Sequence, residues 1–254
     1  MIMDSKQTGE NSLKTFLQTL HKVSILNNKK FDLILGAGDS GQVMIAITKI
    51  FYDYFHLPFP KNIVFPVYRY KKYSKRKLFD NSSIKDDYLK KEIPAEIDSI
   101  LFVDDEIENG VAAKATLDLF LSLKRLSSYF VFTIIAEDGG VDVGKLQEEN
   151  YSVVYYSPKK RIEELYNAIS YIIPEKYVSL IKKSLAFENI SCNNMQLLCI
   201  LLNLPVKELE NLKPKFNYRL QNIVKKSVPN LEELQLAYQE DLTKEIRDFL
   251  KVLD

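Results

Sequence analysis

The chain has 254 residues, of which 46% are hydrophobic and 27% are charged, and its formal net charge is +1. This composition is typical of a globular protein and excludes a disordered chain. The near-neutral charge excludes a basic surface over the whole molecule, so we do not expect nucleic acid as a partner. The length is sufficient for one full α/β domain and a smaller second module.

The sequence carries no signal for secretion or for a membrane. Residues 1–14 are polar, and no run approaches the roughly 18 apolar residues that a membrane span needs. Cys192 and Cys199 are the only cysteines. They are too few for a disulfide framework and lack the spacing of a zinc site. We therefore expect a cytoplasmic protein that contacts no membrane and has no metal site formed by its own residues alone.

Short apolar runs and helical patterns alternate along the first two thirds of the chain. An amphipathic helix is predicted over residues 11–26, capped by Asn11 or Ser12, because apolar side chains recur there at helical spacing. Apolar runs follow at 31–35, 62–68, 99–103, 129–136 and 151–156. These runs lack strict alternation, as expected for strands buried on both faces of a parallel sheet. Helical patterns occupy residues 42–55 and 111–126.

Strands that alternate with helices indicate a doubly wound α/β domain, with a mainly parallel sheet of about five strands, over residues 1–172. One connection in this domain, residues 69–97, is long and rich in lysine, and such loops usually have a function. Residues 173–254 show helical patterns without clear strands, so an all-helical C-terminal module is predicted. Asn230 precedes its long final helix as a predicted N-cap. We expect this module to serve packing or oligomerisation, and a homodimer stays open.

The stretch "FDLILGAGDSGQVMIAI", residues 31–47, contains Gly36, Gly38 and Gly41 in the spacing G-x-G-x-x-G. An apolar run before it and a helical pattern after it form the context of a dinucleotide-binding turn. NAD binding also needs an acid at the end of the next strand, where this chain has Arg69. A dinucleotide-binding Rossmann protein is therefore the third of three hypotheses that the sequence allows.

A second motif, "SILFVDDEIENGVAAKATL", begins at Ser99 and consists of an apolar strand, an acidic run and a turn that leads into a helix. Asp104 and Asp105 stand at the end of this strand, where α/β sheets bind ligands, and carboxylates there suit sugar hydroxyls or Mg²⁺. The turn at Gly110 would direct backbone N–H groups at an anion such as a phosphate. The alternative is an acidic surface turn that caps a helix.

A strand that ends in Asp–Asp, followed by a short glycine-containing loop and a helix, resembles the signature of the type I phosphoribosyltransferases. Two other parts stand in the family's order: a pyrophosphate loop at 36–41 and a long hood at 69–97. The resemblance covers residues 25–160. It implies a phosphoribosyltransferase-like fold and an enzyme that transfers the phosphoribosyl group of 5-phosphoribosyl diphosphate to a base. Pyrophosphate would be released, with Mg²⁺ bound to it, and the partner would be a small phosphorylated sugar or nucleotide.

By position, the resemblance implies that Asp104 and Asp105 are catalytic residues that hold the ribose 2′- and 3′-hydroxyls. The implied substrate-binding residues form the pyrophosphate loop, the 5′-phosphate loop and the basic hood. They are Gly36, Ala37, Gly38, Asp39, Ser40 and Gly41, then Glu108, Asn109, Gly110, Val111 and Ala112, and finally Lys71, Lys72, Lys75 and Arg76.

The sequence departs from the family in the 5′-phosphate loop. The family has Thr-Gly-x-Thr or Thr-Gly-x-Ser where this chain has Asn109-Gly110-Val111-Ala112, so two hydroxyl donors are missing. Asp39 and Glu108 also bring negative charge beside the expected phosphates, which weakens anion binding. The second hypothesis is therefore a non-catalytic phosphoribosyl-ligand sensor or assembly protein on the same fold.

Overall fold

The computed structural model describes residues 5–65, 93–94, 96–107, 113, 116–117, 120, 131–138, 152–156, 168–187, 190–210, 213–217 and 219–253. Two groups of predicted site residues lie outside these residues. They are the basic residues of the hood, Lys71, Lys72, Lys75 and Arg76, and the predicted 5′-phosphate loop from Glu108 to Ala112. The glycine motif and the acidic pair are both described, so their geometry can be compared with the prediction.

Helices and strands alternate through the first part of the chain. This part contains α1 (Ser5–His21), the π-helical turn η1 (Lys22–Leu26), β1 (Leu33–Ala37), α2 (Gly38–Tyr54), β2 (Lys61–Phe65), β3 (Ser99–Ile107), β4 (Val131–Asp138) and β5 (Ser152–Tyr156). The later part contains the 3₁₀ helix η3 (Ala168–Ile172), α6 (Glu175–Phe187), α7 (Asn194–Leu201), β6 (Val206–Glu210), β7 (Lys213–Asn217), α8 (Arg219–Ser227) and α9 (Leu231–Leu250).

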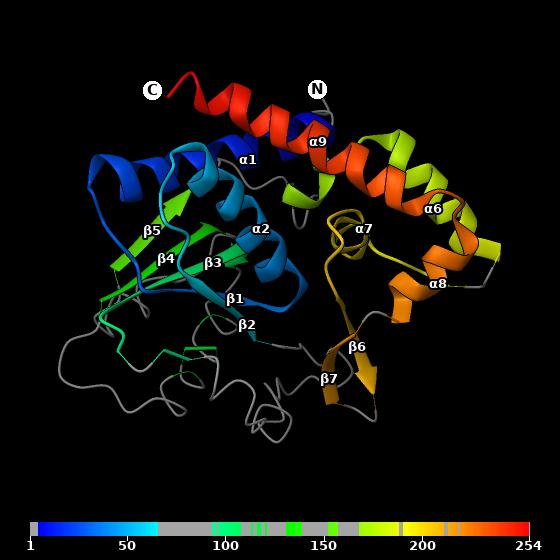
Figure 1. The fold of residues 1–254 in the computed structure, drawn as a ribbon, viewed down its shortest axis with the longest axis horizontal. Coiled ribbons are helices and arrows are strands. Elements are labelled where there is room, and N and C mark those ends of the chain that lie inside the picture. Colours follow the sequence, from blue (N-terminus) through cyan, green and yellow to red (C-terminus); the bar gives the residue numbers. More distant parts are fainter. Residues whose placement is uncertain are drawn as a thin grey trace.

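The strands from β1 to β5 form one parallel sheet in the order β2-β1-β3-β4-β5, and α1 and α2 lie along one of its faces (Figure 1). The predicted α/β fold with a parallel sheet is thereby confirmed. The chain runs from β1 to β2 on one side of it and then crosses to β3 on the other side, from which β4 and β5 follow outward. The strand order thus reverses between β1 and β3, and in open α/β sheets the crevice at such a point is where ligands bind.

The central strands β1 and β3 are buried on both faces. Ile34 of β1 and Leu101 and Val103 of β3 belong to the apolar core beneath α1 and α2. The residues that alternate with them, such as Leu35 and Phe102, point to the opposite face and are also fully buried. This explains the continuous apolar runs in the sequence, since a strand covered on both faces has no solvent side to make polar.

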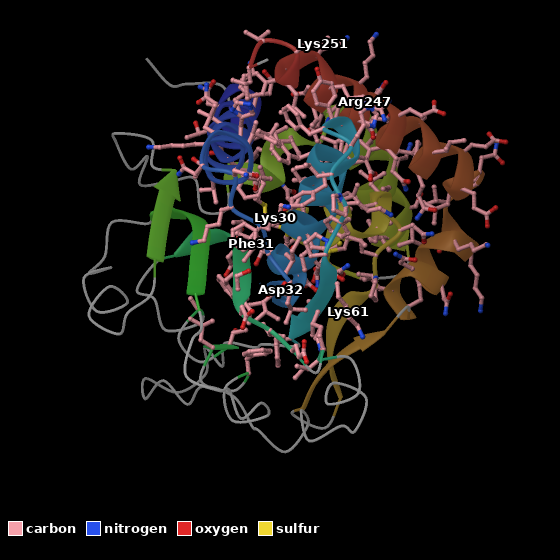
Figure 2. All side chains as sticks on the ribbon, turned by 60° about the vertical axis from the view of Figure 1, so that its left-hand side comes forward. Lys30, Phe31, Asp32, Lys61, Arg247 and Lys251 are labelled. Carbon is pink, nitrogen blue, oxygen red and sulfur yellow. The ribbon has the colours of Figure 1, made fainter. Side chains whose placement is uncertain are left out.

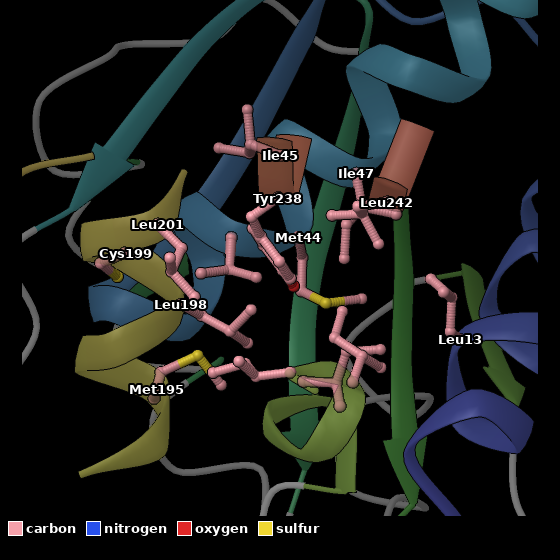
Figure 3. Packing of buried hydrophobic residues seen from close by; sticks show 14 of the residues in the cluster. Leu13, Met44, Ile45, Ile47, Met195, Leu198, Cys199, Leu201, Tyr238 and Leu242 are labelled. Carbon is pink, nitrogen blue, oxygen red and sulfur yellow. The ribbon is translucent and has the colours of Figure 1, made fainter. Parts of the chain in front are cut away.

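One apolar core joins the sheet to the C-terminal helices. Met44 and Ile47 of α2 lie in the same buried cluster as Leu198 of α7 and as Tyr238 and Leu242 of α9 (Figure 3). Burial of such side chains contributes about 1.5–3 kcal/mol each. Helix α2 therefore packs on the sheet with one side and on the C-terminal helices with another.

The C-terminal module is not all-helical, which corrects the prediction. Strands β6 and β7 pair antiparallel between α7 and α8. Their sequences, VKELE and KPKFN, contain leucine and several lysine or glutamate residues that also favour helices. The cross-strand pairing from Val206 with Asn217 to Glu210 with Lys213 decides the structure, and sequence periodicity does not reveal it.

Two helix starts also differ from the prediction. Helix α1 begins at Ser5, so Asn11 and Ser12 lie inside it instead of capping it. Asn230 does occupy the N-cap position of α9, but its φ is 57° and its side chain makes no capping hydrogen bond. Its left-handed conformation, which asparagine adopts more readily than most residues, turns the chain between α8 and α9.

At the amino ends of the strands, Asp32, which precedes β1, bonds to the backbone at the start of β3. Its Oδ2 accepts hydrogen bonds from the backbone N–H groups of Asp98 and Ser99, both at 2.9 Å. Figure 2 shows Asp32 beside Lys30 and Phe31, far from Arg247 and Lys251 at the end of α9. Asp32 thus fixes the start of β3 against β1. The candidate site lies at the other end of these strands, their carboxyl ends.

Candidate functional site at the carboxyl ends of β1 and β3

The glycine motif and the acidic pair meet at the carboxyl edge of the sheet, at the point where the strand order reverses. Gly36 of β1 pairs with Val103 of β3, and this is the last pair of the β1–β3 ladder. The next residues are Ala37, followed by the start of α2, and Asp104. The two motifs, which are far apart in the sequence, are therefore direct neighbours.

Each of the three glycines has a structural reason. A Cβ atom on Gly36 would lie 2.7 Å from the carbonyl carbon of Gly41, and one on Gly41 would lie 2.5 Å from that of Gly36. Gly36 and Gly41 therefore let the first turn of α2 pack directly on β1. Gly38 has φ of 64°, a conformation that side-chain-bearing residues rarely adopt. The motif thus makes a sharp strand-to-helix turn with closely packed backbones.

Ser40 links this turn to the acidic pair. Its Oγ donates a hydrogen bond to Oδ1 of Asp104 at 2.7 Å. The backbone N–H of Asp105 donates to the same oxygen at 3.0 Å. The N-cap of α2 is Ala37, whose side chain has no acceptor to offer the first-turn amides, and the positive end of the helix dipole lies at this turn.

Asp104 and Asp105 lie at an irregularity in β3. The register between β3 and β4 shifts between Val103 and Glu106, so that β3 contains one more residue than β4 there. In a regular strand, neighbouring side chains point to opposite faces, whereas such bulges redirect side chains and are common near active sites. Both aspartates are only 5% exposed.

The environment of the pair favours the protonated form of Asp105. Burial raises the pKa of this carboxyl well above its ordinary value, and the negative charge of Asp104 raises it further. A hydrogen bond with Ser40 acts in the opposite direction. Two adjacent buried carboxyl groups resist simultaneous ionisation. A cation or several hydroxyl donors at this position would relieve that repulsion, which makes the pair suitable for a polar ligand.

Asp39 faces the C-terminal helices. Its carboxylate Oδ1 lies 3.5 Å from the side-chain nitrogen of Gln42, and its carbonyl oxygen lies 3.8 Å from Sγ of Cys199 on α7. Burial raises the pKa of the Cys192 thiol to about 12, with the Lys182 charge opposing this and the Asp39 charge adding to it. An acid in the first turn of a helix is also favourable for the helix dipole.

Gln42, just after Gly41, connects this turn to the C-terminal part of the chain, and the sequence did not predict this contact. Its side chain is 5% exposed, and its Nε2 donates to the carbonyl oxygen of Pro205 and lies 3.4 Å from Sγ of Cys199. The only available signal was a glutamine among the apolar residues that follow Gly41. Its partners lie about 160 positions further along the chain, beyond the reach of any local pattern.

The described residues contain no group of three or more His, Cys, Asp or Glu side chains that could hold a metal ion. The acidic pair offers oxygen ligands only, and this suits Mg²⁺ that is held mainly by the phosphates of a ligand. Among the same residues, no helix is both long and apolar enough to cross a membrane.

Comparisons with known proteins give no family for this chain. No family model matches it, and no curated protein matches it. Among solved structures, a xanthine-guanine-hypoxanthine phosphoribosyltransferase from Helicobacter pylori is 12% identical over 56% of this chain and 81% of that chain, with a TM-score of 0.34. The protein TT1426 from Thermus thermophilus is 12% identical over 66% of this chain and 88% of that chain, with a TM-score of 0.33. Similarity at this level assigns neither a function nor a substrate.

Proposed function

We propose that the chain binds 5-phosphoribosyl diphosphate or a related phosphoribosyl ligand at the carboxyl ends of β1 and β3. In this proposal the ligand places its ribose over Asp104 and Asp105 and its pyrophosphate against the turn of Gly36 to Gly41. The chain would then transfer the phosphoribosyl group to a base with release of pyrophosphate. The basic hood and the predicted 5′-phosphate loop would complete the site.

One observation carries the proposal, namely the hydrogen bond from Ser40 to Asp104 at 2.7 Å. It joins a turn suited to anions and a carboxyl pair suited to hydroxyl groups into one site. That site stands where the strand order of the sheet reverses, which is the common ligand position in such folds. A dinucleotide site needs the turn but has no use for a buried acidic pair on the neighbouring strand.

The residues suggest a division of tasks. The first-turn amides and the dipole of α2 would stabilise the negative charge of the departing pyrophosphate. Asp104 and Asp105 would accept hydrogen bonds from the ribose hydroxyls and so fix the sugar relative to the incoming base. Mg²⁺ would neutralise the charge of the pyrophosphate when bound, and Asp104 and Asp105 are the residues that would offer it oxygen ligands.

Thermal unfolding in a titration with 5-phosphoribosyl diphosphate and Mg²⁺ tests the proposal. A ligand at roughly 1,000 times its dissociation constant stabilises the folded state by about 4 kcal/mol, so the unfolding temperature should rise with ligand concentration. The variant Asp105→Asn should lose this rise, whereas the exposed Asp53→Asn on α2 should keep it. No rise for the wild-type protein at millimolar ligand would refute the proposal.

The second candidate function is a phosphoribosyl-ligand sensor without catalysis. Its support is the contact between α7 and the first turn of α2, through Cys199, Asp39 and Gln42. This contact would let ligand binding at the turn affect the C-terminal helices. A rise in unfolding temperature without pyrophosphate release, over a panel of purine and pyrimidine bases, would select the sensor over the enzyme.

A further inference from the structure

Four glutamine side chains converge on the segment that leaves α7. Gln235 and Gln239 of α9 donate to the carbonyl oxygens of Ile200 and Leu201, at 2.5 and 3.0 Å. Gln221 of α8 donates to the carbonyl oxygen of Leu204, and Gln42 of α2 donates to that of Pro205. Residues 200–205 are thus held by carboxamides from three different helices.

The carbonyl groups of Ile200 and Leu201 lie at the end of α7, where a helix leaves carbonyl groups without intrahelical donors, and those of Leu204 and Pro205 lie in the segment that follows. Within the described residues, Gln42 differs from the other three because it alone comes from the α/β part of the chain. It stands one residue after Gly41, in the turn that also presents Ser40 to Asp104. One helical turn therefore contacts the acidic pair on one side and the C-terminal segment on the other.

We propose that Gln42 is a positioning residue, through which residues 200–205 fix the first turn of α2 and thereby set the affinity of the site for pyrophosphate. The turn lacks a side-chain cap, because its N-cap is Ala37. Its position therefore depends on packing against Gly36, on the bond from Ser40 to Asp104, and on the contacts of Asp39 and Gln42 with α7 and Pro205. Loss of the Gln42 bond frees the turn to move away from its ligand-binding position.

The close packing of Gly36 and Gly41 makes the position of the turn sensitive to the position of Gln42. Backbone atoms that pack without intervening side chains leave no flexible group to absorb a displacement. A shift of Gln42 by a fraction of an ångström is therefore passed on to Gly41 and Ser40. The part of this inference that concerns pyrophosphate rests on the proposed function, and the part that concerns the order of the turn does not.

The test compares Gln42→Met with Gln221→Met. Methionine has nearly the same length and shape as glutamine but cannot donate, and both glutamines are buried, with exposures of 5% and 7%. Both variants remove one carboxamide bond to the same segment, but only Gln42→Met removes it from the turn. Hydrogen exchange of the unliganded protein at the amides of residues 41–43, the first that can bond to carbonyl groups of the turn, reports the order of the turn.

A hydrogen bond contributes about 0.5–1.5 kcal/mol, so exchange at residues 41–43 should become about two- to tenfold faster in Gln42→Met. Gln221→Met should leave it unchanged although it lowers overall stability. The dissociation constant for inorganic pyrophosphate with Mg²⁺ should rise by a similar factor in Gln42→Met alone. Equal exchange at the turn in both variants would overturn the inference.

A further variant covers the case in which Gln42→Met does not fold. Cys199→Ala removes the sulfur that contacts Gln42 and Asp39 and should accelerate exchange at the turn in the same direction, by a smaller factor. Unchanged exchange in that variant would count against the inference. Failure of the wild-type protein to bind pyrophosphate would refute the proposed function, whereas the exchange comparison would still decide whether Gln42 orders the turn.

Discussion

At the scale of single residues, the site has two features. One is a backbone contact that leaves no room for a side chain, and the other is a pair of buried carboxyl groups. Gly36 and Gly41 touch backbone to backbone, and Asp104 and Asp105 are adjacent carboxyl groups almost without solvent contact. Both features are costly for stability. They persist in proteins mainly where geometry for a ligand outweighs the cost.

The variant Gly41→Ala should be destabilised, because its Cβ would lie 2.5 Å from the carbonyl carbon of Gly36. Forcing strand and helix apart should lower the free energy of unfolding by about 1–3 kcal/mol or more, measured by urea unfolding. Asp53→Ala, at an exposed position of the same helix, adds no atoms between α2 and β1 and serves as the control. Wild-type stability of Gly41→Ala would mean that α2 does not pack on β1 as described.

Asp105→Asn should be more stable than the wild-type protein at high pH and equally stable at low pH. The pKa of Asp105 is raised in the folded state by burial and then by the charge of Asp104. The folded state therefore binds this proton more tightly than the unfolded chain does, and stability falls as pH rises from the ordinary aspartate pKa through the raised one. The asparagine cannot ionise and avoids this loss.

Unfolding temperatures measured across pH check this prediction. Above the raised pKa the variant should unfold about 2–4 °C higher for each kcal/mol of relieved penalty. The difference should disappear below the ordinary aspartate pKa, where both states of the wild-type chain are protonated. A variant that is less stable than wild type by the same amount at every pH would contradict the account.

At the scale of elements, α7 connects the site to the rest of the C-terminal helices, and a capping box fixes its start. Oδ1 of Asn193 accepts from the backbone N–H of Gln196 at 2.9 Å, and Oε1 of Gln196 accepts from the backbone N–H of Asn193 at 3.0 Å. Asn193→Ala should therefore lower the free energy of unfolding by about 1 kcal/mol. Asn193→Asp keeps an acceptor at the cap and should lose less in urea unfolding, so equal losses would contradict this role.

The sequence predicts the central strands β1 and β3 well, because a strand segment buried on both faces must be apolar, as in "LILGA" and "ILFV". Strands β6 and β7 are not predicted, because their charged residues are compatible with a helix or a strand. Their antiparallel pairing with each other determines that they form strands. The glycine turn and the acidic pair are visible in the sequence. The register shift at Asp104 and the bond from Gln42 to Pro205 are not, since both arise from distant parts of the chain.

At the scale of the whole molecule, one apolar core extends from Leu13 of α1 to Leu250 of α9. The division at residues 172 and 173 stays a prediction of chain organisation, but this core crosses it. Calorimetry should therefore show one unfolding transition, with equal calorimetric and van't Hoff enthalpies. Two separate transitions would show that the C-terminal helices fold as an independent domain.

The central claim is that the glycine turn and the acidic pair form one ligand site. Hydrogen exchange with and without 5-phosphoribosyl diphosphate and Mg²⁺ tests it most directly. The ligand should slow exchange together at residues 38–40, the first-turn amides of α2, and at residues 104–105, with the same dependence on ligand concentration. No protection, or protection of only one of the two segments, would contradict the claim.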